Sequence, residues 1–137
     1  MEFLEQRREH AVALFRIVIG LFFVFHGVQK LSKGVELLSW PAGPMALIEL
    51  IGGGLILIGL WTRWAALLSS GAMAYAYFVV HQPKGLLPIE NGGELAAVYS
   101  WAFLLLAFTG AGAGASTRFA SRRRSHSPRR DVMRGMH

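Results

Sequence analysis

Four long apolar stretches constrain the fold of this chain more than any other feature of its sequence. They cover approximately residues 11–31, 44–62, 64–81 and 94–113. Each is close to the roughly 20 residues that an α-helix needs to cross a hydrocarbon layer of about 30 Å. Hydrophobic residues make up 53% of the 137 residues, and charged residues only 16%. The pattern predicts an all-α fold, a membrane four-helix bundle with four transmembrane helices.

The segments between these stretches contain residues that end helices. Lys33, Glu36 and the sequence "WPAGP" follow the first stretch, "WTRW" separates the second from the third, and "HQPKGLLPIENGGE" precedes the fourth. The Pro, Gly and Asn residues of the first and third segments are typical of turns. A compact soluble helical bundle is the alternative fold. We favour the membrane bundle because the second and fourth stretches lack the polar face of a soluble surface helix.

The distribution of charge predicts how the bundle is oriented. Residues 1–117 contain seven Lys or Arg and seven Glu, so the net charge of +6 comes from residues 118–137, which contain seven Arg and one Asp. Lys and Arg next to membrane spans stay cytoplasmic. With four crossings, both termini lie on one side of the membrane. We therefore expect the N- and C-termini to be cytoplasmic.

This reading divides the chain into three parts. Residues 1–10 form a cytoplasmic N-terminal segment, residues 11–113 the four-span domain, and residues 114–137 a basic tail in the cytoplasm. Ser, Pro and Gly among the arginines of the tail are typical of disorder. A polybasic segment beside a span is attracted to anionic lipid. We expect the C-terminal Arg cluster to bind anionic lipid rather than nucleic acid.

The first two apolar stretches carry ionisable residues whose positions are informative. An ionisable group at the centre of a span costs roughly 2.5–3.5 kcal/mol on insertion scales, so it faces the bundle interior and finds a partner. At 100° per residue, Arg16, His26 and Lys30 share one helix face with two glycines. Glu49 lies on a glycine-lined face of the second stretch. Small residues let two helices approach closely in lipid, so these faces can meet.

The expected depth of each residue in the membrane places further polar residues at the same level as these. At 1.5 Å per residue, His26 and Glu49 both lie roughly 7–8 Å below the outer ends of their helices. We expect a buried polar cluster of His26, Lys30, Glu49, His81 and Glu94, with Gln29, Tyr77 and Asn91 in reach. Arg16 lies near the cytoplasmic end without an acid at its depth. It is expected to extend to the lipid headgroups or to cap carbonyls of a neighbouring helix.

Three blocks of the sequence resemble a known family. In order, "RIVIGLFFVFHGVQKL", "IELIGGGLILIGLWTRWAA" and "NGGELAAVY" are similar to the DoxX family of small four-helix membrane proteins, over most of residues 11–113. The residues at the family's characteristic positions are Arg16, Gly20, His26, Gly27, Lys30, Leu31, Glu49, Gly53, Arg63, Asn91, Gly92, Glu94 and Tyr99. The resemblance implies a multi-pass protein of the bacterial inner membrane, associated with redox and oxidative-stress complexes.

Four functional readings of the cluster remain open. The first is structural: the charges fix which helices adjoin, and the protein is a small non-catalytic subunit or scaffold of a redox assembly, with protein partners or as a homo-oligomer. The second is a quinone site, since His donates hydrogen bonds and Glu relays protons. The third is zinc or haem, although the spacing matches no ligand motif. The fourth is transport of protons or small solutes.

Composition narrows the chemistry further. The chain contains no cysteine, which excludes disulfides, thiolate metal sites, iron–sulfur clusters and thiol nucleophiles. The serines within the apolar stretches lack the His and Asp partners of a nucleophilic triad. We therefore assign no catalytic residue and no metal ligand, and regard the chain as a possible oxidoreductase subunit without a catalytic motif of its own.

Overall fold

The computed structural model describes residues 1–114, and the regular elements in that range are all helical. The four long helices are α1 (Glu2–Ser32), α2 (Ala42–Ile58), α3 (Thr62–Ala76) and α5 (Glu94–Thr109). A π-helical turn (Tyr77–His81) continues α3, and a 3₁₀ turn (Gln82–Lys84) and the short α4 (Pro88–Asn91) follow. The all-α prediction is confirmed. The prediction for the basic tail falls on residues 115–137, outside the described part.

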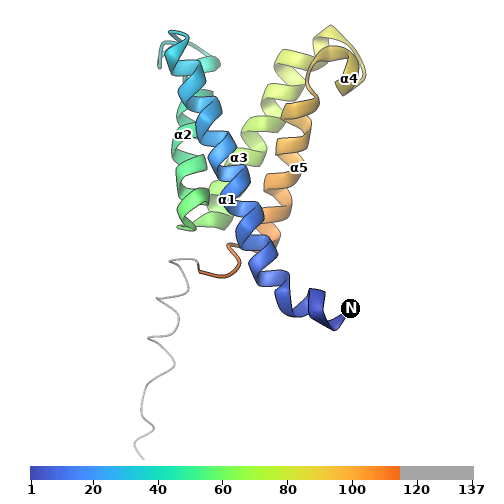
Figure 1. Cartoon of the computed structure of the whole chain (residues 1–137). Helices are drawn as coiled ribbons and strands as arrows, with labels where there is room; N and C mark the ends of the chain where they lie inside the picture. Colours follow the sequence, from blue (N-terminus) through green and yellow to red (C-terminus); the bar gives the residue numbers. More distant parts are fainter. Residues whose placement is uncertain (115–137) are drawn as a thin grey trace, which may run out of the picture.

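The helices pair as two hairpins, α1 with α2 and α3 with α5 (Figure 1). Contacts between α2 and α3 join the hairpins, whereas the backbones of α1 and α5 approach each other closely at few points. The hairpins lie close together at the end near the N-terminus and diverge toward the end that carries α4 (Figure 1). The bundle is therefore wedge-shaped, and its wide end is the one at which the sequence places the polar cluster.

Tight turns explain where the helices end. Gly59 stops α2 in the left-handed conformation, with φ of 76°, which glycine adopts without a steric penalty. Trp61 also has positive φ, 48°, and α3 begins directly after it. The second apolar stretch was expected to continue to residue 62, so α2 is shorter than that stretch. The difference arises because the last residues of the stretch form the turn.

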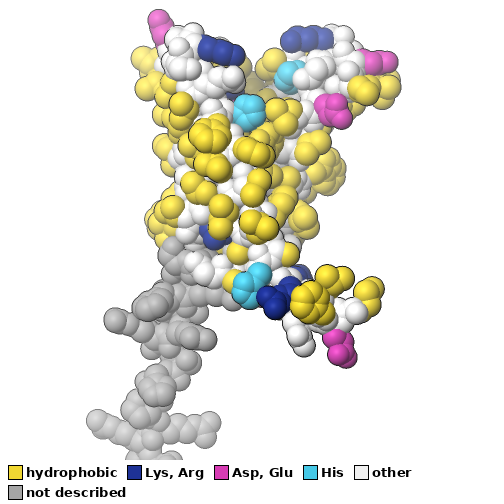
Figure 2. Space-filling view, in the orientation of Figure 1, with side chains coloured by type: hydrophobic (Ala, Val, Ile, Leu, Met, Phe, Trp, Pro, Cys, Tyr) yellow, Lys and Arg dark blue, Asp and Glu magenta, His cyan; other side chains and the backbone are white. Residues whose placement is uncertain are grey.

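Large apolar side chains lie mainly on the outside of this bundle. The interior contains small residues such as Ala46, Ala66 and Ser69, around a few large side chains including Phe23 and Phe103. Exposed residues include Phe22, Ile51, Leu68 and Phe108. Figure 2 shows apolar side chains covering the middle of the molecule, with most charged side chains near its two ends. A surface of this kind is expected against lipid, because soluble monomers rarely expose large apolar patches.

Helix length and composition can also be used to ask which helices could cross a membrane. Among the described residues, α1 is the one helix that is both long and apolar enough to cross a membrane by itself. The helices α2 and α5 are apolar but have 17 and 16 residues. The helix α3 has 15 residues before its π-helical turn extends it to His81. Helix length and composition alone therefore identify one candidate span.

Candidate functional site

A cavity of about 200 Å³ lies inside the wide end of the bundle. All four long helices line it, together with the π-helical turn and the segment before α5. Its polar wall residues are His26, Lys30, Glu49, His81 and Tyr99. Apolar side chains, including Phe23, Met73 and Leu95, form the rest of the wall. The cavity thus combines hydrogen-bonding groups from every helix with an apolar lining.

Lys30 and Glu49 form an ion pair across the α1–α2 interface. Lys30 Nζ donates a hydrogen bond to Glu49 Oε1 at 2.6 Å. The Glu49 side chain is 4% exposed, whereas that of Lys30 is 36% exposed. The second carboxylate oxygen, Glu49 Oε2, is buried and has no hydrogen-bond partner within the described residues. The cavity wall therefore holds an acceptor that is not satisfied, beside a cation with donors to spare.

Glycines bring α1 and α2 close enough to form this pair. A Cβ added at Gly20 would lie 2.9 Å from Leu57 N, and one at Gly27 would lie 3.0 Å from Ala46 O. On the facing helix, a Cβ at Gly53 would lie 3.0 Å from Val24 N. These atoms belong to the backbone, which cannot move aside as a side chain can. The glycine-lined faces expected from the sequence therefore face each other in the structure.

Histidine and tyrosine side chains form another part of the cavity wall. The His26 ring lies edge-on to Tyr99, with 5.7 Å between the ring centroids, and Tyr99 stacks on Phe103. His81 lies in the π-helical turn, and its Nδ1 is 3.4 Å from Asn91 O. The two histidines thus come from helices at different positions in the chain and line the same cavity.

Asn91 organises the loop above the cavity. Its Nδ2 donates to Gly85 O at 2.9 Å, and its Oδ1 accepts a hydrogen bond from Gly93 N at 2.8 Å. Tyr77 Oη lies 3.5 Å from the same Nδ2. Asn91 is the last residue of α4, and it is buried. Asn91 and Tyr77 therefore shape the segment that joins α3 to α5 at the wide end, without lining the cavity themselves.

Three predicted residues lie away from the cavity. Glu94 was expected in the cluster, but it is exposed because the inward face of α5 carries Ala96, Tyr99 and Phe103. Gln29 is also exposed and lines a hollow outside His26. Arg63 lies at the opposite end of the bundle, where it contacts Gly110.

Arg16 lies away from the cavity and binds the C-terminal end of α2. Its Nη1 donates to Ile56 O and to Leu57 O, both at 2.9 Å. These carbonyls belong to the last turn of α2, where helix carbonyls lack partners within the helix. The side chain is 4% exposed. Of the two expectations for this residue, capping of a neighbouring helix is the one observed.

The sequence patterns did not identify some of the contacts that hold the site together. Ser70 Oγ donates to Ser100 O at 2.7 Å, and Ser100 Oγ donates to Ser70 O at 3.1 Å, which joins α3 to α5. The apolar wall residues Met73 and Leu95 were also not expected, because apolar residues occur on every face of these helices. Within residues 1–114, no group of three or more His, Asp or Glu side chains is arranged to hold a metal ion.

Comparisons with known proteins place the chain among its relatives. The family model described as DoxX matches residues 11–82, which is more than half of the chain. A protein of Haemophilus influenzae described as uncharacterized is 44% identical over 124 residues, covering 82% of this chain and 92% of the relative. No solved structure matches significantly. With its apolar outer surface and its matching sequence, the chain belongs to the DoxX family of membrane proteins.

Proposed function

We propose that this protein is a four-span subunit of the bacterial inner membrane with both termini in the cytoplasm. The apolar outer surface extends around all four long helices, which supports a position in lipid for each of them. At 1.5 Å per residue, the 17 residues of α2 reach about 25 Å, slightly less than an average hydrocarbon core. Local thinning of the bilayer compensates for a mismatch of this size at modest cost.

Within that frame, the cavity is best explained as a binding site for the polar head of a lipid-soluble redox molecule, with a quinone as the favoured class. One observation carries this proposal: beside the Lys30–Glu49 pair, polar side chains from separate helices line a space, and Glu49 Oε2 has no hydrogen-bond partner there. A purely structural polar cluster would be closely packed and fully satisfied. A head group of this size would fill the space and complete the hydrogen bonding.

The side chains present fit a quinone head group. Its two carbonyls require donors, and Lys30 Nζ and the imidazoles of His26 and His81 face the cavity. Glu49 lies beside Lys30 and supplies an acceptor for the hydroxyl of a reduced head group. A bound quinone supplies electron-transfer chemistry, while the residues of this chain bind and orient it. The chain contains no cysteine, so electrons would come from a partner protein in a redox or oxidative-stress assembly.

A scaffold role is the second candidate. It is favoured by the ion pair between Lys30 and Glu49 and by the close glycine contacts, because both hold α1 and α2 in one register. A scaffold would use the cluster only to fix the helix arrangement and would present its surface to partner subunits or to further copies of the chain. The two candidates differ in whether a small molecule occupies the cavity.

Native mass spectrometry of the full chain in nanodiscs distinguishes them. If the proposal holds, wild-type protein retains a molecule with the mass of a quinone, and Glu49→Gln and His26→Ala lose it while remaining folded in thermal unfolding. The matched control is Glu90→Gln, an exposed carboxylate at the same end, which should retain the molecule. A wild-type protein without a bound small molecule, combined with lower thermal stability of the cavity variants, would instead support the scaffold.

A further inference from the structure

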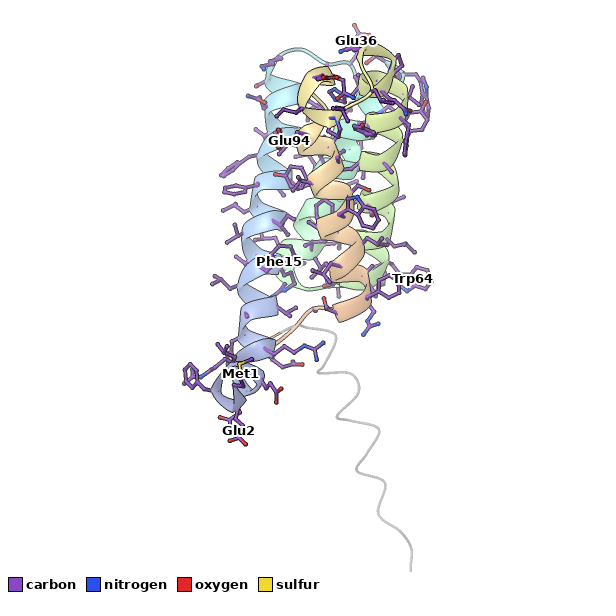
Figure 3. All side chains as sticks on the ribbon, turned by 90° about the vertical axis from the view of Figure 1, so that its right-hand side faces the viewer. Met1, Glu2, Phe15, Glu36, Trp64 and Glu94 are labelled. Carbon is purple, nitrogen blue, oxygen red and sulfur yellow. The ribbon has the colours of Figure 1, made fainter. Side chains whose placement is uncertain are left out.

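The four helices leave one seam of the bundle incompletely packed. The helix α1 packs along α2, and α3 packs along α5, whereas the backbones of α1 and α5 approach each other closely at few points and meet through the rings of Phe23, Tyr99 and Phe103. Figure 3 views the molecule with α1 and α5 side by side, Glu94 near the wide end of the seam and Phe15 farther down. Large aromatic residues on α1 line this seam, in contrast to the glycines that face α2.

Two hollows follow the seam from the cavity. The first has a volume of about 530 Å³ and shares His26, Leu95 and Tyr99 with the cavity wall. The second, of about 260 Å³, shares Phe22, Leu95 and Tyr99 with the first and continues down to Phe15. Because neighbouring hollows share wall residues, the cavity and the two hollows lie next to one another and mark out a path along the seam. The path begins at charged groups and ends among apolar side chains.

We propose that this seam, defined by Phe15, Val18, Phe22, Leu95 and Val98, binds the linear apolar tail of the molecule whose head occupies the cavity. The ligand is then an amphiphile that enters sideways from the bilayer between α1 and α5, rather than from water. The inference rests on the proposed binding function of the cavity and specifies the ligand class for that site.

The dimensions of the cavity and the seam support a ligand with a small head group and a long apolar tail. Sites that enclose a whole drug-sized ligand have volumes of about 300–1,000 Å³. The cavity, at about 200 Å³, accommodates a head group only. From His26 to Phe15, at 1.5 Å per residue, the seam is about 16 Å long. A tail that leaves the cavity beside His26 therefore has an apolar surface to follow for half the thickness of a membrane.

Charge defines the head group. Lys30 and Glu49 already neutralise each other at 2.6 Å, so an ionic head would leave one charge in the cavity unpaired. Glu49 Oε2 lacks a donor, and the ammonium of Lys30 has donors left. A neutral hydroxylated ring meets both requirements, because its hydroxyl group donates one hydrogen bond and accepts another. The favoured ligand class is therefore a neutral, hydroxylated head on a long apolar tail.

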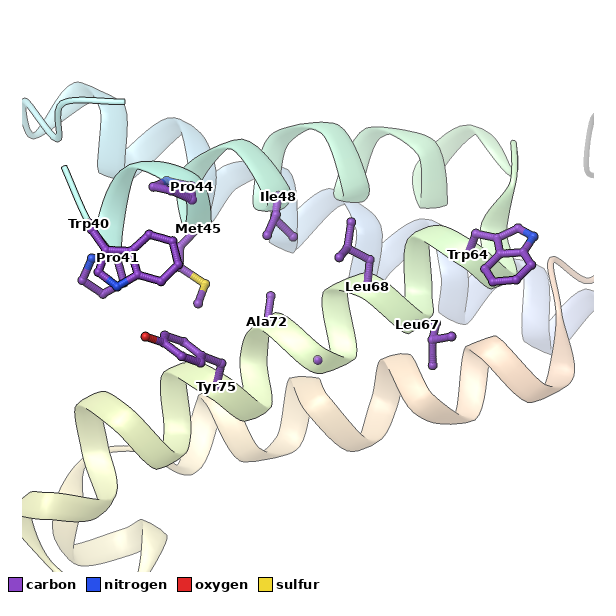
Figure 4. Close-up of a pocket in the computed structure, with 11 residues that line it drawn as sticks. Trp40, Pro41, Pro44, Met45, Ile48, Trp64, Leu67, Leu68, Ala72 and Tyr75 are labelled. Atoms are coloured by element: carbon purple, nitrogen blue, oxygen red, sulfur yellow. The ribbon is translucent and has the colours of Figure 1, made fainter. Parts of the chain in front are cut away.

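A further apolar hollow, away from the seam, provides an internal control. It has a volume of about 480 Å³ and lies between α2 and α3, with Trp40 near one end and Trp64 near the other (Figure 4). Ile48, Leu68 and Tyr75 are among its wall residues. It shares no wall residue with the polar cavity. An apolar tail attached to a head in the cavity should therefore occupy the α1–α5 seam and not this hollow.

Photo-crosslinking in nanodiscs tests the proposal. The probe is a long-chain alkylphenol with a diazirine in its tail, and the competitor is the same molecule without the diazirine. We expect crosslinks on α1 between residues 15 and 22 and on α5 between residues 95 and 98, and we expect the competitor to suppress them. Crosslinks concentrated on Leu67, Leu68 and Tyr75, or distributed equally over all exposed apolar residues, would overturn the proposal.

A blocking substitution gives a second readout. Val98→Trp fills the seam and should reduce retention of the long-chain phenol at least tenfold in native mass spectrometry, while phenol without a tail binds as in wild type. Leu68→Trp, in the α2–α3 hollow, should change neither the retention of the long-chain phenol nor the binding of the phenol without a tail. Equal retention of the long-chain phenol by wild type and Val98→Trp would refute the seam as the tail site but not the cavity as the head-group site. Failure of wild-type protein to bind either phenol would refute the cavity as a binding site as well.

Discussion

The two sides of α1 are built in opposite ways. The side that faces α2 carries Gly20 and Gly27, which bring the two backbones into contact, and it is joined to α2 by hydrogen bonds from Arg16 and Lys30. The side that faces α5 carries Phe15 and other large residues and leaves hollows along the seam. In lipid, apolar side chains gain little from meeting each other, so close packing and hydrogen bonds decide which helices associate. The small residues on one side of α1 thus allow close backbone packing against α2, whereas the large residues on the other side leave hollows toward α5. We call these the closed and the open side of α1.

The largest expected effect comes from breaking the ion pair on the closed side. Lys30→Met leaves Glu49 buried without its cation, which should cost about 3 kcal/mol or more in free energy of unfolding. Titration with a denaturing detergent, followed by circular dichroism, measures the loss. The double variant Lys30→Met/Glu49→Gln should recover most of the stability because no buried charge remains. If single and double variants are equally unstable, the pair does not account for the stability of this interface.

Overpacking the glycine contact should have the next largest effect. Gly20→Val places a side chain 2.9 Å from Leu57 N, so α1 and α2 must separate, at a cost of about 2–3 kcal/mol. Gly54→Ala is the matched control, since a Cβ there meets nothing within 4 Å. The same unfolding titration should show the control to be as stable as wild type. Similar behaviour of the two variants would contradict a backbone contact at Gly20.

Removing the cap on α2 should have a smaller effect. Arg16→Gln withdraws the hydrogen bonds to Ile56 O and Leu57 O, and loss of charge-assisted bonds of this kind costs about 2 kcal/mol. Hydrogen exchange measured by mass spectrometry should show faster exchange confined to the last turn of α2 and the following turn. Exchange that increases equally in α3 and α5 would show that Arg16 supports the whole bundle instead.

The smallest effect is expected on the open side. Val98 is 58% exposed and lines a hollow, so Val98→Ala removes few contacts and should change the free energy of unfolding by less than about 0.5 kcal/mol. The unfolding titration of this variant is directly comparable with that of Gly20→Val. A loss above about 1 kcal/mol would mean that the seam is a packed interface.

Helix periodicity was sufficient to predict the closed side of α1. It placed Arg16, Lys30 and two glycines on one face, and depth counting placed Glu49 at the level of His26. The structure shows the facing glycines and the contact between Lys30 and Glu49. Prediction succeeded there because glycine and charge are rare in apolar helices, so their spacing identifies a face.

The open side could not be predicted in the same way. Phe22, Leu95 and Val98 do not differ in chemistry from residues that face lipid, so no sequence pattern shows that they line a seam. The position of Glu94 was also missed, although α5 begins at Glu94 as the sequence indicated, because the buried face of α5 is formed by Ala96, Tyr99 and Phe103 and leaves Glu94 exposed. The cavity itself results from the divergence of the hairpins, which is a property of the whole bundle.

Spin-label distances test the contrast between the two sides of α1 most directly. The chain has no native cysteine, so labels can be introduced at Ile17 and Leu105 for the α1–α5 seam, and at Val28 and Leu47 for the α1–α2 interface. In nanodiscs, addition of the long-chain phenol should shift the distance distribution of the seam pair and leave that of the α1–α2 pair unchanged. Two equally narrow distributions, neither altered by the phenol, would contradict the account.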